Sequence, residues 1–325
     1  MAITFVQHSY ASVVDSSPGT HEIDTIVVTG TRTEKHLTNS PVRTEVIATE
    51  VIEKQHARNM QDALRYAPGL LLRDIHGKTG QSAWIQGLDS DRVLVLVNGE
   101  KLSASTGSTV DLSQISTLSI KQIEIIKGAS SALYGSEAMG GVINIITNQP
   151  EAGWHGQIKG DLGSHNEKNQ AQDSFPNRLY SAGNLSFSNN QWDIILGADL
   201  RHSDGYTISE DAYHLRGESG YKSNQHLTLG YQFNEQFNTK LAYRGYAEDH
   251  TLKDDLVIPG QSPLDRHEQA QSQHLSLAND WLVSNAHALK TSSYVEQYQG
   301  QTQADIHRKN EIEFLSQELQ HDWSI

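Results

Sequence analysis

The sequence predicts an α+β domain followed by antiparallel transmembrane β-barrel strands. Residues 121–147, KQIEIIKGASSALYGSEAMGGVINIIT, carry two Ile- and Val-rich runs joined by small residues and glycines. Ile and Val fit a buried pleated surface, and glycine lets backbones approach closely, so this segment predicts a compact core piece. Beyond Trp154 apolar and polar residues alternate, which is the period of half-buried strands. The links between these later segments are short and long in turn, which is typical of an outer-membrane barrel.

A mixed domain is expected from Val42 to about Pro150. Its apolar runs predict strands at 43–48, 69–73, 83–86, 92–97, 123–126 and 142–146. The dipeptide Asn98-Gly99 follows one of these runs and predicts a tight turn.

Two short helices are expected between the first strands. Thr49 is placed to cap a helix through Gln55, and Asn59 to cap a second helix through about Tyr66. Pro68-Gly69 ends the second helix because proline cannot continue it.

About eight alternating segments follow, the first at Gly156–Gly163. In residues 191–201 the apolar side chains share one face and the charged ones take the other: Trp192, Ile194, Leu196, Ala198 and Leu200 against Asp193, Asp199 and Arg201. Short turns are expected at 188–190, 234–236 and 284–285, and long links at 164–178, 202–224, 248–271 and 300–311. A membrane barrel predicts this alternation of links, whereas a soluble antiparallel sandwich, the open alternative, does not require it.

Composition excludes several classes of protein. The chain has 325 residues and no cysteine, so disulfides and thiolate metal sites are absent. A formal charge of −14 disfavours binding to nucleic acid or to anionic lipid through a basic patch. The longest apolar run, Val93 to Val97, is far short of the roughly 20 residues of a spanning helix. The first residues form no complete signal peptide; they are the end of one or a disordered leader.

Each candidate enzymatic motif lacks a residue that it requires. Gly77-Lys78-Thr79 lacks the glycine that a phosphate loop needs five positions earlier, where Leu72 stands. Gly128–Ala132 ends on alanine where a nucleophile elbow ends on glycine. The sixteen histidines include no HExxH pair, so neither a catalytic residue nor a metal site is assigned.

Two groups of polar residues are expected in the long links. Glu248, Asp249, Asp254 and Asp255 are interpreted as a solvated acidic loop in preference to a cation site. His214 and His250 are the histidines that we would test for haem or metal binding.

Six motifs occur in an order that resembles the plug domain of TonB-dependent outer-membrane receptors. They are Asp24–Thr29 (DTIVVT), Ala63–Gly69 (ALRYAPG), Ile85–Leu88 (IQGL), Arg92–Gly99 (RVLVLVNG), Asp111–Ile115 (DLSQI) and the segment 121–147. Each motif alone is weak, but six in register are specific, and they cover about residues 24–150. The later half resembles the family by its strand pattern.

The resemblance implies three parts: a tail with a TonB box (1–37), a plug domain (38–150) and a partial barrel of about eight strands (151–325). The barrel would be an incomplete one of the 22-strand type with a plugged lumen. Such receptors import scarce ligands across the outer membrane and are not enzymes, and no cofactor is implied. The implied ligand is an iron complex, either a siderophore or haem. Cobalamin import, or a signalling receptor without import, is the alternative, although signalling members carry an additional N-terminal domain.

The TonB box is the first implied binding segment. In residues Asp24, Thr25, Ile26, Val27, Val28 and Thr29 a β-prone stretch stands in a polar tail and is suited to strand addition on TonB. An ordinary first strand of the plug is the alternative interpretation.

The ligand site is expected where plug turns face outward, opposite the box. From the plug the candidates are His76, Lys78, Gln81, Trp84, Ser103, Ser105 and Thr106, and from one long link they are Tyr206, Tyr213, His214, Arg216 and Tyr221. Each offers a hydrogen bond, a charge or a stacking face, and a solvated loop residue is the alternative for each.

The length suggests a fragment. A barrel of 22 strands at about 10 residues each, with its links, needs well over 400 residues, and only about 170 follow Trp154. We therefore expect further barrel strands beyond this sequence, because an open sheet edge in lipid leaves unpaired backbone groups.

Overall fold

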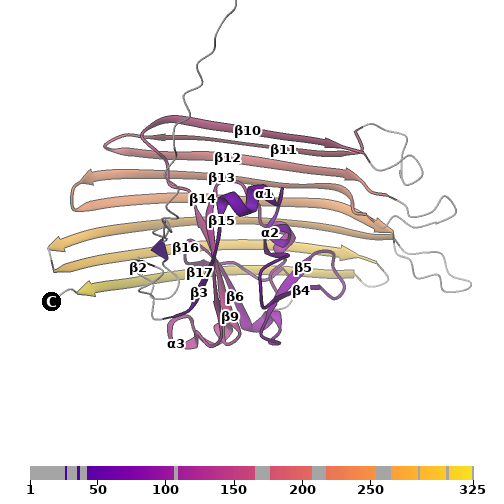
Figure 1. Ribbon diagram of the computed structural model, residues 1–325, viewed down its shortest axis with the longest axis horizontal. Helices are drawn as coiled ribbons and strands as arrows, with labels where there is room; N and C mark the ends of the chain where they lie inside the picture. Colours follow the sequence, from indigo (N-terminus) through magenta and orange to yellow (C-terminus); the bar gives the residue numbers. More distant parts are fainter. Residues whose placement is uncertain are drawn as a thin grey trace, which may run out of the picture.

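The fold is described from a computed structural model, which describes residues 26–27, 35–36, 42–105, 109–164, 176–206, 217–253, 265–284, 286–304 and 307–323. An α+β domain is followed by eight long antiparallel strands, as the sequence predicts (Figure 1). Among the described residues no helix is both long and apolar enough to span a bilayer.

The N-terminal domain is built on a mixed five-stranded sheet in the order β3-β8-β9-β6-β7. Its strands are β3 (Thr44–Ala48), β6 (Val93–Val97), β7 (Glu100–Lys101), β8 (Ile120–Lys127) and β9 (Gly141–Thr147). The pair β6–β9 is parallel and the other pairs are antiparallel. Two separate clusters of buried apolar side chains accompany this sheet, one built around Ile123 and Ile143 and the other around Ile126 and Val142.

Short elements surround this sheet. They are α1 (Thr49–Lys54), α2 (Met60–Leu64), α3 (Ser131–Tyr134), the single 3₁₀ turns η2 (Ser90–Arg92), η3 (Leu112–Gln114) and η4 (Ser136–Ala138), and the hairpin of β4 (Leu70–Asp74) and β5 (Gln81–Ile85). The turn between β6 and β7 is the predicted one: Asn98 and Gly99 both have positive φ, of 51° and 84°.

One helix cap is predicted correctly and the other is wrong. The Asn59 side chain accepts a hydrogen bond from the Asp62 amide at 2.9 Å and caps α2. Thr49 lies inside α1, whose cap residue is Ala48. The Thr49 hydroxyl lies instead 2.6 Å from the Ile120 carbonyl oxygen, because that residue of β8 lies beside the start of α1.

The second sheet, which we call the wall, consists of eight strands in chain order, each antiparallel to the next. They are β10 (Gly153–Gly163), β11 (Arg178–Ser188), β12 (Trp192–Asp204), β13 (Ser219–Asn234), β14 (Phe237–Lys253), β15 (Asp265–Ser284), β16 (His287–Gln303) and β17 (His307–Trp323). The links at one end contain two or three residues, and the first three at the other end are long (Figure 1).

The fourth long link, expected at 300–311, is wrong. The strands β16 and β17 continue to Gln303 and from His307, and their register pairs Gln303 with His307. The predicted link was polar, but polar residues also form strands where both faces of a sheet are wetted or face a polar neighbour. For the same reason β13 begins inside the long link expected at 202–224, and β14 and β15 extend well into the one expected at 248–271.

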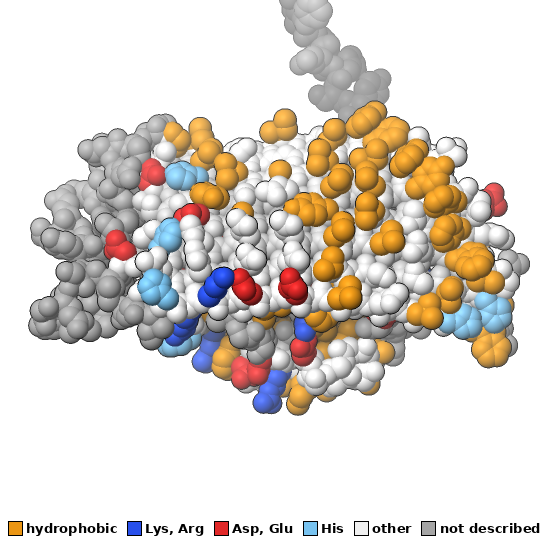
Figure 2. Space-filling view, turned by 180° about the vertical axis from the view of Figure 1, so that it is seen from behind, with side chains coloured by type: hydrophobic (Ala, Val, Ile, Leu, Met, Phe, Trp, Pro, Cys, Tyr) orange, Lys and Arg blue, Asp and Glu red, His pale blue; other side chains and the backbone are white. Residues whose placement is uncertain are grey.

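The two faces of the wall have opposite character. On the outer face Leu196, Leu275 and Trp281 are about half exposed, whereas on the inner face Asp199 and His274 are almost completely buried. Figure 2 shows the outer face: the apolar side chains gather over the half nearest the short turns, and polar ones occupy the half nearest the long links. The N-terminal domain lies against the inner face (Figure 1). This is the inverted arrangement of a membrane barrel, apolar outside and polar inside.

Candidate ligand-binding site

The loop between β4 and β5 (residues 75–80), which we call the apex loop, places a lysine against the wall. Lys78 is 7% exposed, and its Nζ lies 2.9 Å from Asp111 Oδ2 and 2.9 Å from Glu248 Oε1. Glu268 Oε2 is 3.6 Å away. Asp111 comes from the N-terminal domain, whereas the two glutamates stand on β14 and β15. The Lys78 ammonium therefore joins the N-terminal domain to the wall through three carboxylates.

Burial by itself would lower the pKa of Lys78, because a charged amine loses its hydration. The neighbouring Asp111, Glu248 and Glu268 carboxylates outweigh this effect and raise the pKa of Lys78 well above its ordinary value. The lysine is therefore charged throughout the physiological range, and it is held by its partners rather than free for a ligand.

Thr79 adds three hydrogen bonds across the same interface. Its amide donates to Glu268 Oε1 at 2.8 Å, and its hydroxyl donates to Glu268 Oε2 at 2.8 Å. The same hydroxyl lies 2.7 Å from His250 Nε2. Since a hydroxyl carries one proton, a hydroxyl that donates to Glu268 requires His250 Nε2 to be the donor in the second bond. The apex loop thus fixes the orientation of the His250 ring.

Glu248 is the centre of this polar network. Its Oε1 accepts from Lys78 and, at 2.7 Å, from Gln114 Nε2, and its Oε2 accepts from Tyr246 at 2.7 Å. Ser105 donates to Gln114 Oε1 at 2.8 Å and so connects the segment after β7 to the network. The buried carboxylate has a full set of partners, which is the condition under which a buried charge is tolerated.

An open cavity of about 410 Å³ lies beside the network on the side of the long links. Its lining is polar and comes from the N-terminal domain and from β14 to β17: Gly77, Lys78, Ser105, Glu248, Glu268, Gln269, Tyr298, Gly300, Gln301, Thr302, His307, Arg308, Lys309 and Asn310. The guanidinium of Arg308 lies directly against Gly77, where a β-carbon would stand 2.1 Å from Nη1. Asn310 donates to the Ser105 carbonyl oxygen at 3.1 Å.

A second polar contact holds strand β7 to the wall. Glu100 Oε2 lies 2.9 Å from His274 Nε2 and 3.5 Å from an Arg244 nitrogen. Burial alone would raise the pKa of Glu100, but the His274 hydrogen bond and the Arg244 charge lower it below its ordinary value. The Ser103 amide donates to Glu296 on β16 at 3.1 Å. This contact and the Lys78 network both anchor the domain to the wall by hydrogen-bonded ions.

The predicted candidates divide into groups. Lys78 and Ser105 line the cavity, and Ser103 lies at the second contact through its backbone. His76 is exposed in the apex loop, and Tyr206 lies just after β12. Thr106, Tyr213, His214 and Arg216 lie outside the described residues.

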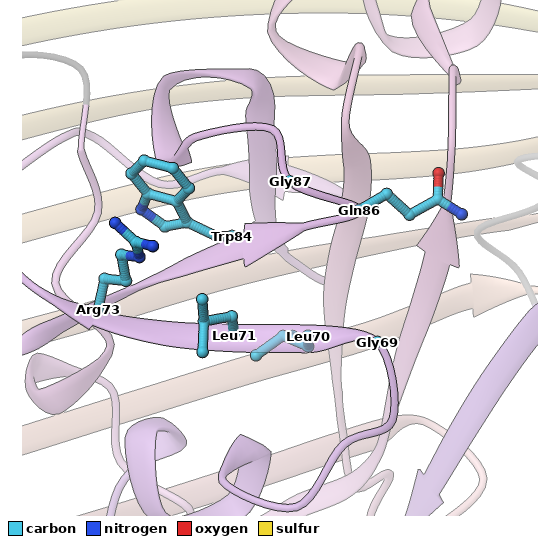
Figure 3. A pocket seen from close by; sticks show the side chains of 7 residues that line it. All are labelled: Gly69, Leu70, Leu71, Arg73, Trp84, Gln86 and Gly87. Atoms are coloured by element: carbon cyan, nitrogen blue, oxygen red, sulfur yellow. The ribbon is translucent and has the colours of Figure 1, made fainter.

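Gln81 and Trp84 lie on β5, away from this cavity. Gln81 donates to Asp74 at 2.8 Å within the hairpin. Trp84 lines a second cavity of about 350 Å³, shown in Figure 3, where the Arg73 guanidinium lies 4.5 Å from the ring centroid. Their residue types suit ligand contacts, but they stand on a regular strand and neither lines the cavity beside Lys78.

Four residues of the network were not among the predicted ligand-site residues: Asp111, Glu248, His250 and Glu268. Of these, Glu248 and His250 were considered only for binding a metal ion or haem. The solvated acidic loop expected around Glu248 is wrong for this residue, which is 3% exposed on β14. His250, expected in a link, is 2% exposed on the same strand. The available signal was the alternation itself, since Glu248 and His250 continue the inward-facing positions of β14 beyond Tyr246. In the described residues no group of three or more His, Cys, Asp or Glu side chains is arranged to hold a metal ion.

Of the proposed TonB box, only Ile26 and Val27 belong to the described residues. They form β1 (Ile26–Val27), which pairs antiparallel with β2 (Lys35–His36). Val27 is 1% exposed. Asp24, Thr25, Val28 and Thr29 lie outside the described residues.

Comparisons with known proteins agree with this architecture. Residues 36–142 match the family model of the TonB-dependent receptor plug domain. The vitamin B12 transporter BtuB of Vibrio vulnificus (strain CMCP6) is 30% identical over 227 residues, which are 69% of this chain and 35% of that protein. This chain therefore spans about a third of the length of that relative.

Solved structures share the fold at lower identity. The siderophore receptor PiuA of Acinetobacter baumannii superposes with a TM-score of 0.64 at 16% identity, covering 88% of this chain and 43% of PiuA. A mutant of the ferric enterobactin receptor PfeA of Pseudomonas aeruginosa gives 0.58 at 15% identity, covering 80% and 41%. These structures share the fold, and the plug-domain match of residues 36–142 together with the BtuB relative identifies the chain as a member of the TonB-dependent receptor family.

Proposed function

We propose that this chain is part of an outer-membrane receptor that imports a scarce iron complex, a siderophore or haem, by energy-coupled transport. The observation that carries the proposal is the apex loop, which meets the inner face of the wall beside an open polar cavity. The cavity lies on the side of the long links, which face outward in barrels of this kind. The proposed receptor has its tail at 1–37, its plug at 38–150 and its barrel from 151 onward.

An anionic iron complex is favoured by the mouth of the cavity. Arg308 lies there against Gly77, and a guanidinium presents paired donors to carboxylate or catecholate oxygens. The charge of Lys78 is already matched by its three carboxylates, so we assign it a positioning role. Cobalamin is the second candidate, because the 30% identical relative is named a vitamin B12 transporter.

Energy coupling is assigned to Asp24–Thr29 through strand addition to TonB. The antiparallel pairing of Ile26 and Val27 with β2 supports this, because strand addition uses the same kind of main-chain pairing. A pull on the tail would reach β3 first, since β3 is the next strand of the plug sheet along the chain.

The test is growth of a strain that lacks its own receptors for iron complexes and cobalamin and expresses the gene carrying this chain. We expect growth on at least one ferric siderophore or on haem as the iron source. Val27→Pro should abolish growth but not ligand binding, because proline cannot donate to a partner strand, whereas the control Val27→Thr keeps the β-propensity. Growth on cobalamin alone would replace the iron complex by the second candidate, and growth on none of these would refute uptake.

A further inference from the structure

Two histidines lie in contact on the outer face of the wall, at the end that carries the short turns. His287 is the first residue of β16 and pairs directly with Trp323 of β17, whereas His321 pairs with Leu289. Leu319 and Trp323 are exposed on the outer face, and His321 lies between them in the alternation. His287 and His321 are therefore diagonal neighbours on one face of the sheet, and we call them the histidine pair.

The two imidazole rings approach each other through their nitrogens. His287 Nδ1 lies 3.1 Å from His321 Nε2, and the ring planes differ by only 8°. The Trp323 ring lies nearly parallel to the His287 ring, at 11° and with 6.0 Å between centroids. His321 is exposed and His287 is half-buried, so solvent reaches the pair. Figure 2 shows histidine side chains beside the apolar half, at the end of the wall nearest the short turns.

Each ring has a second nitrogen on which it can carry its proton. A neutral imidazole has one N–H and one lone pair, and either nitrogen can hold the proton. Within the described residues His287 Nε2 and His321 Nδ1 have no hydrogen-bond partner. When the protons sit on these two nitrogens, the lone pairs of the nitrogens that lie 3.1 Å apart are both available. Two lone pairs at this distance repel each other unless a cation binds both.

The spacing of the two nitrogens fits a single metal ion. A divalent transition metal binds imidazole nitrogen at about 2.0–2.1 Å. Two such bonds at about 90–109°, the angles of square-planar and tetrahedral sites, place the nitrogens about 2.9–3.4 Å apart. The observed separation of 3.1 Å lies within this range. Rotation about the last side-chain torsion of histidine, whose energy profile is broad, can direct both lone pairs to one ion without a change in the backbone.

The donor atoms select the class of ion. Two imidazoles without a carboxylate suit copper, nickel or zinc, whereas Ca²⁺ and Mg²⁺ prefer oxygen ligands. Asp322, which lies between His321 and Trp323 in the chain, belongs to the inner face and lies 3.6 Å from Lys290. Its carboxylate is therefore not a ligand of the pair. Among the divalent ions of this class Cu²⁺ binds most tightly to a given set of nitrogen ligands.

We infer that His287 and His321 form a bidentate binding site for a divalent transition metal ion, with Cu²⁺ bound most tightly. Water occupies the remaining coordination positions. The ion joins β16 to β17 at the end of the wall. The site rests on the geometry of the histidine pair, and the proposed outer-membrane location adds only that this end faces the periplasm, where the short turns of such barrels lie.

The test is calorimetric titration of Cu²⁺ into the full-length receptor, purified in detergent without a histidine tag. We expect a site that saturates at micromolar Cu²⁺ and whose electron paramagnetic resonance spectrum shows two imidazole nitrogens. His287→Gln and His321→Gln each remove one ligand and should weaken this site at least tenfold. The double variant should lose little more, because a single imidazole no longer chelates. The control His155→Gln removes an exposed histidine whose cross-strand partner is Ser186, and it should leave binding unchanged.

Three results would overturn the inference. They are equal Cu²⁺ affinity of the wild type and the two single variants, losses in the single variants that add up in the double variant, and a wild-type spectrum with only one imidazole nitrogen. The spectrum of the wild type needs no variant, so the inference stays testable if a variant is unstable. Because the assay involves neither growth nor TonB, failed growth with intact Cu²⁺ binding would count against the proposed uptake alone.

Discussion

Removal of the Lys78 charge is the sharpest test of the plug–wall contact. The variant Lys78→Met keeps the aliphatic stem but leaves Asp111, Glu248 and Glu268 without their shared cation. Coulomb attraction at 2.9 Å and an effective dielectric constant of about 20 is roughly 6 kcal/mol for each pair, most of it offset by desolvation. Deleting one partner of a buried ion pair costs about 3–5 kcal/mol, because an unmatched charge stays buried. We expect this loss in the free energy of plug unfolding.

The assay is pulse proteolysis of the plug across a urea series, on receptor purified in detergent. Lys159→Met is a matched control, because Lys159 also joins plug and wall, through Glu53 at 2.8 Å, but both side chains are more than a third exposed. Solvent screening reduces such a pair to less than about 1 kcal/mol. Equal losses in the two variants would refute the reasoning.

A second variant separates lost charge from lost packing. Lys78→Met/Glu248→Gln removes one of the unmatched carboxylates and should recover part of the stability, whereas a packing defect would remain. The sign of the pH dependence also follows. Because the folded pKa of Lys78 is raised, its contribution is complete below the ordinary value of 10.5 and is lost only as the pH rises through the higher folded value.

Three further changes test other parts of the plug. Since the folded pKa of Glu100 is lowered, its stabilisation is present above its ordinary value of 4.5 and is lost as the pH falls through the folded value; Glu100→Gln should therefore reduce the acid-induced loss measured by proteolysis. Gly141→Ala would place a β-carbon 2.3 Å from the Ile126 carbonyl oxygen and should cost more than about 2 kcal/mol, whereas Gly87→Ala, strained at φ +81° but in open space, should cost about 1 kcal/mol in the same urea series. Asn59→Ala should cost about 1 kcal/mol by loss of the α2 cap, and Asn59→Asp should keep it.

The alternation of apolar and polar residues predicts which face of the wall a side chain lies on, but not which residues it contacts. Leu275 and His274 are neighbours with opposite burial, as the alternation requires, because successive strand residues point to opposite faces. The same rule places Glu248 inward only if residue 248 belongs to a strand. Its acidic neighbours suggested a loop. Near the long links both faces of the wall are polar, so no alternation of apolar and polar residues indicated a strand there.

The partners of Lys78 could not be predicted from the sequence for a different reason. Glu248 and Glu268 lie 170 and 190 residues further along the chain, and no local spacing links them to a glycine-rich loop. The motif order identified the plug, and so the apex loop, but the wall strands that reach it depend on the register of β14 and β15. Asn98-Gly99 was predictable because its turn depends on its own φ angles, whereas Thr49 was misassigned because β8 takes up its hydroxyl.

The proposed transport requires a plug that is held by the wall and can separate from it, and the distribution of contacts suits both requirements. Its two main apolar clusters contain only residues between positions 42 and 145, so they do not depend on the wall. The described contacts with the wall are mostly hydrogen bonds and ion pairs, with a small apolar exception where Leu118 packs on Tyr180 and Ala182. Polar groups that separate can be rehydrated, whereas separated apolar surfaces lose about 25 cal/mol for each Å² exposed.

The order of the strands in the plug sheet gives the effect of a pull a direction. The strand β3, which follows the tail, is at one edge of the sheet, and β7, anchored through Glu100, is at the other. In the proposed energy coupling, a pull on the tail would therefore act on the edge farthest from that anchor and would peel β3 from β8 before it loads the contact with the wall.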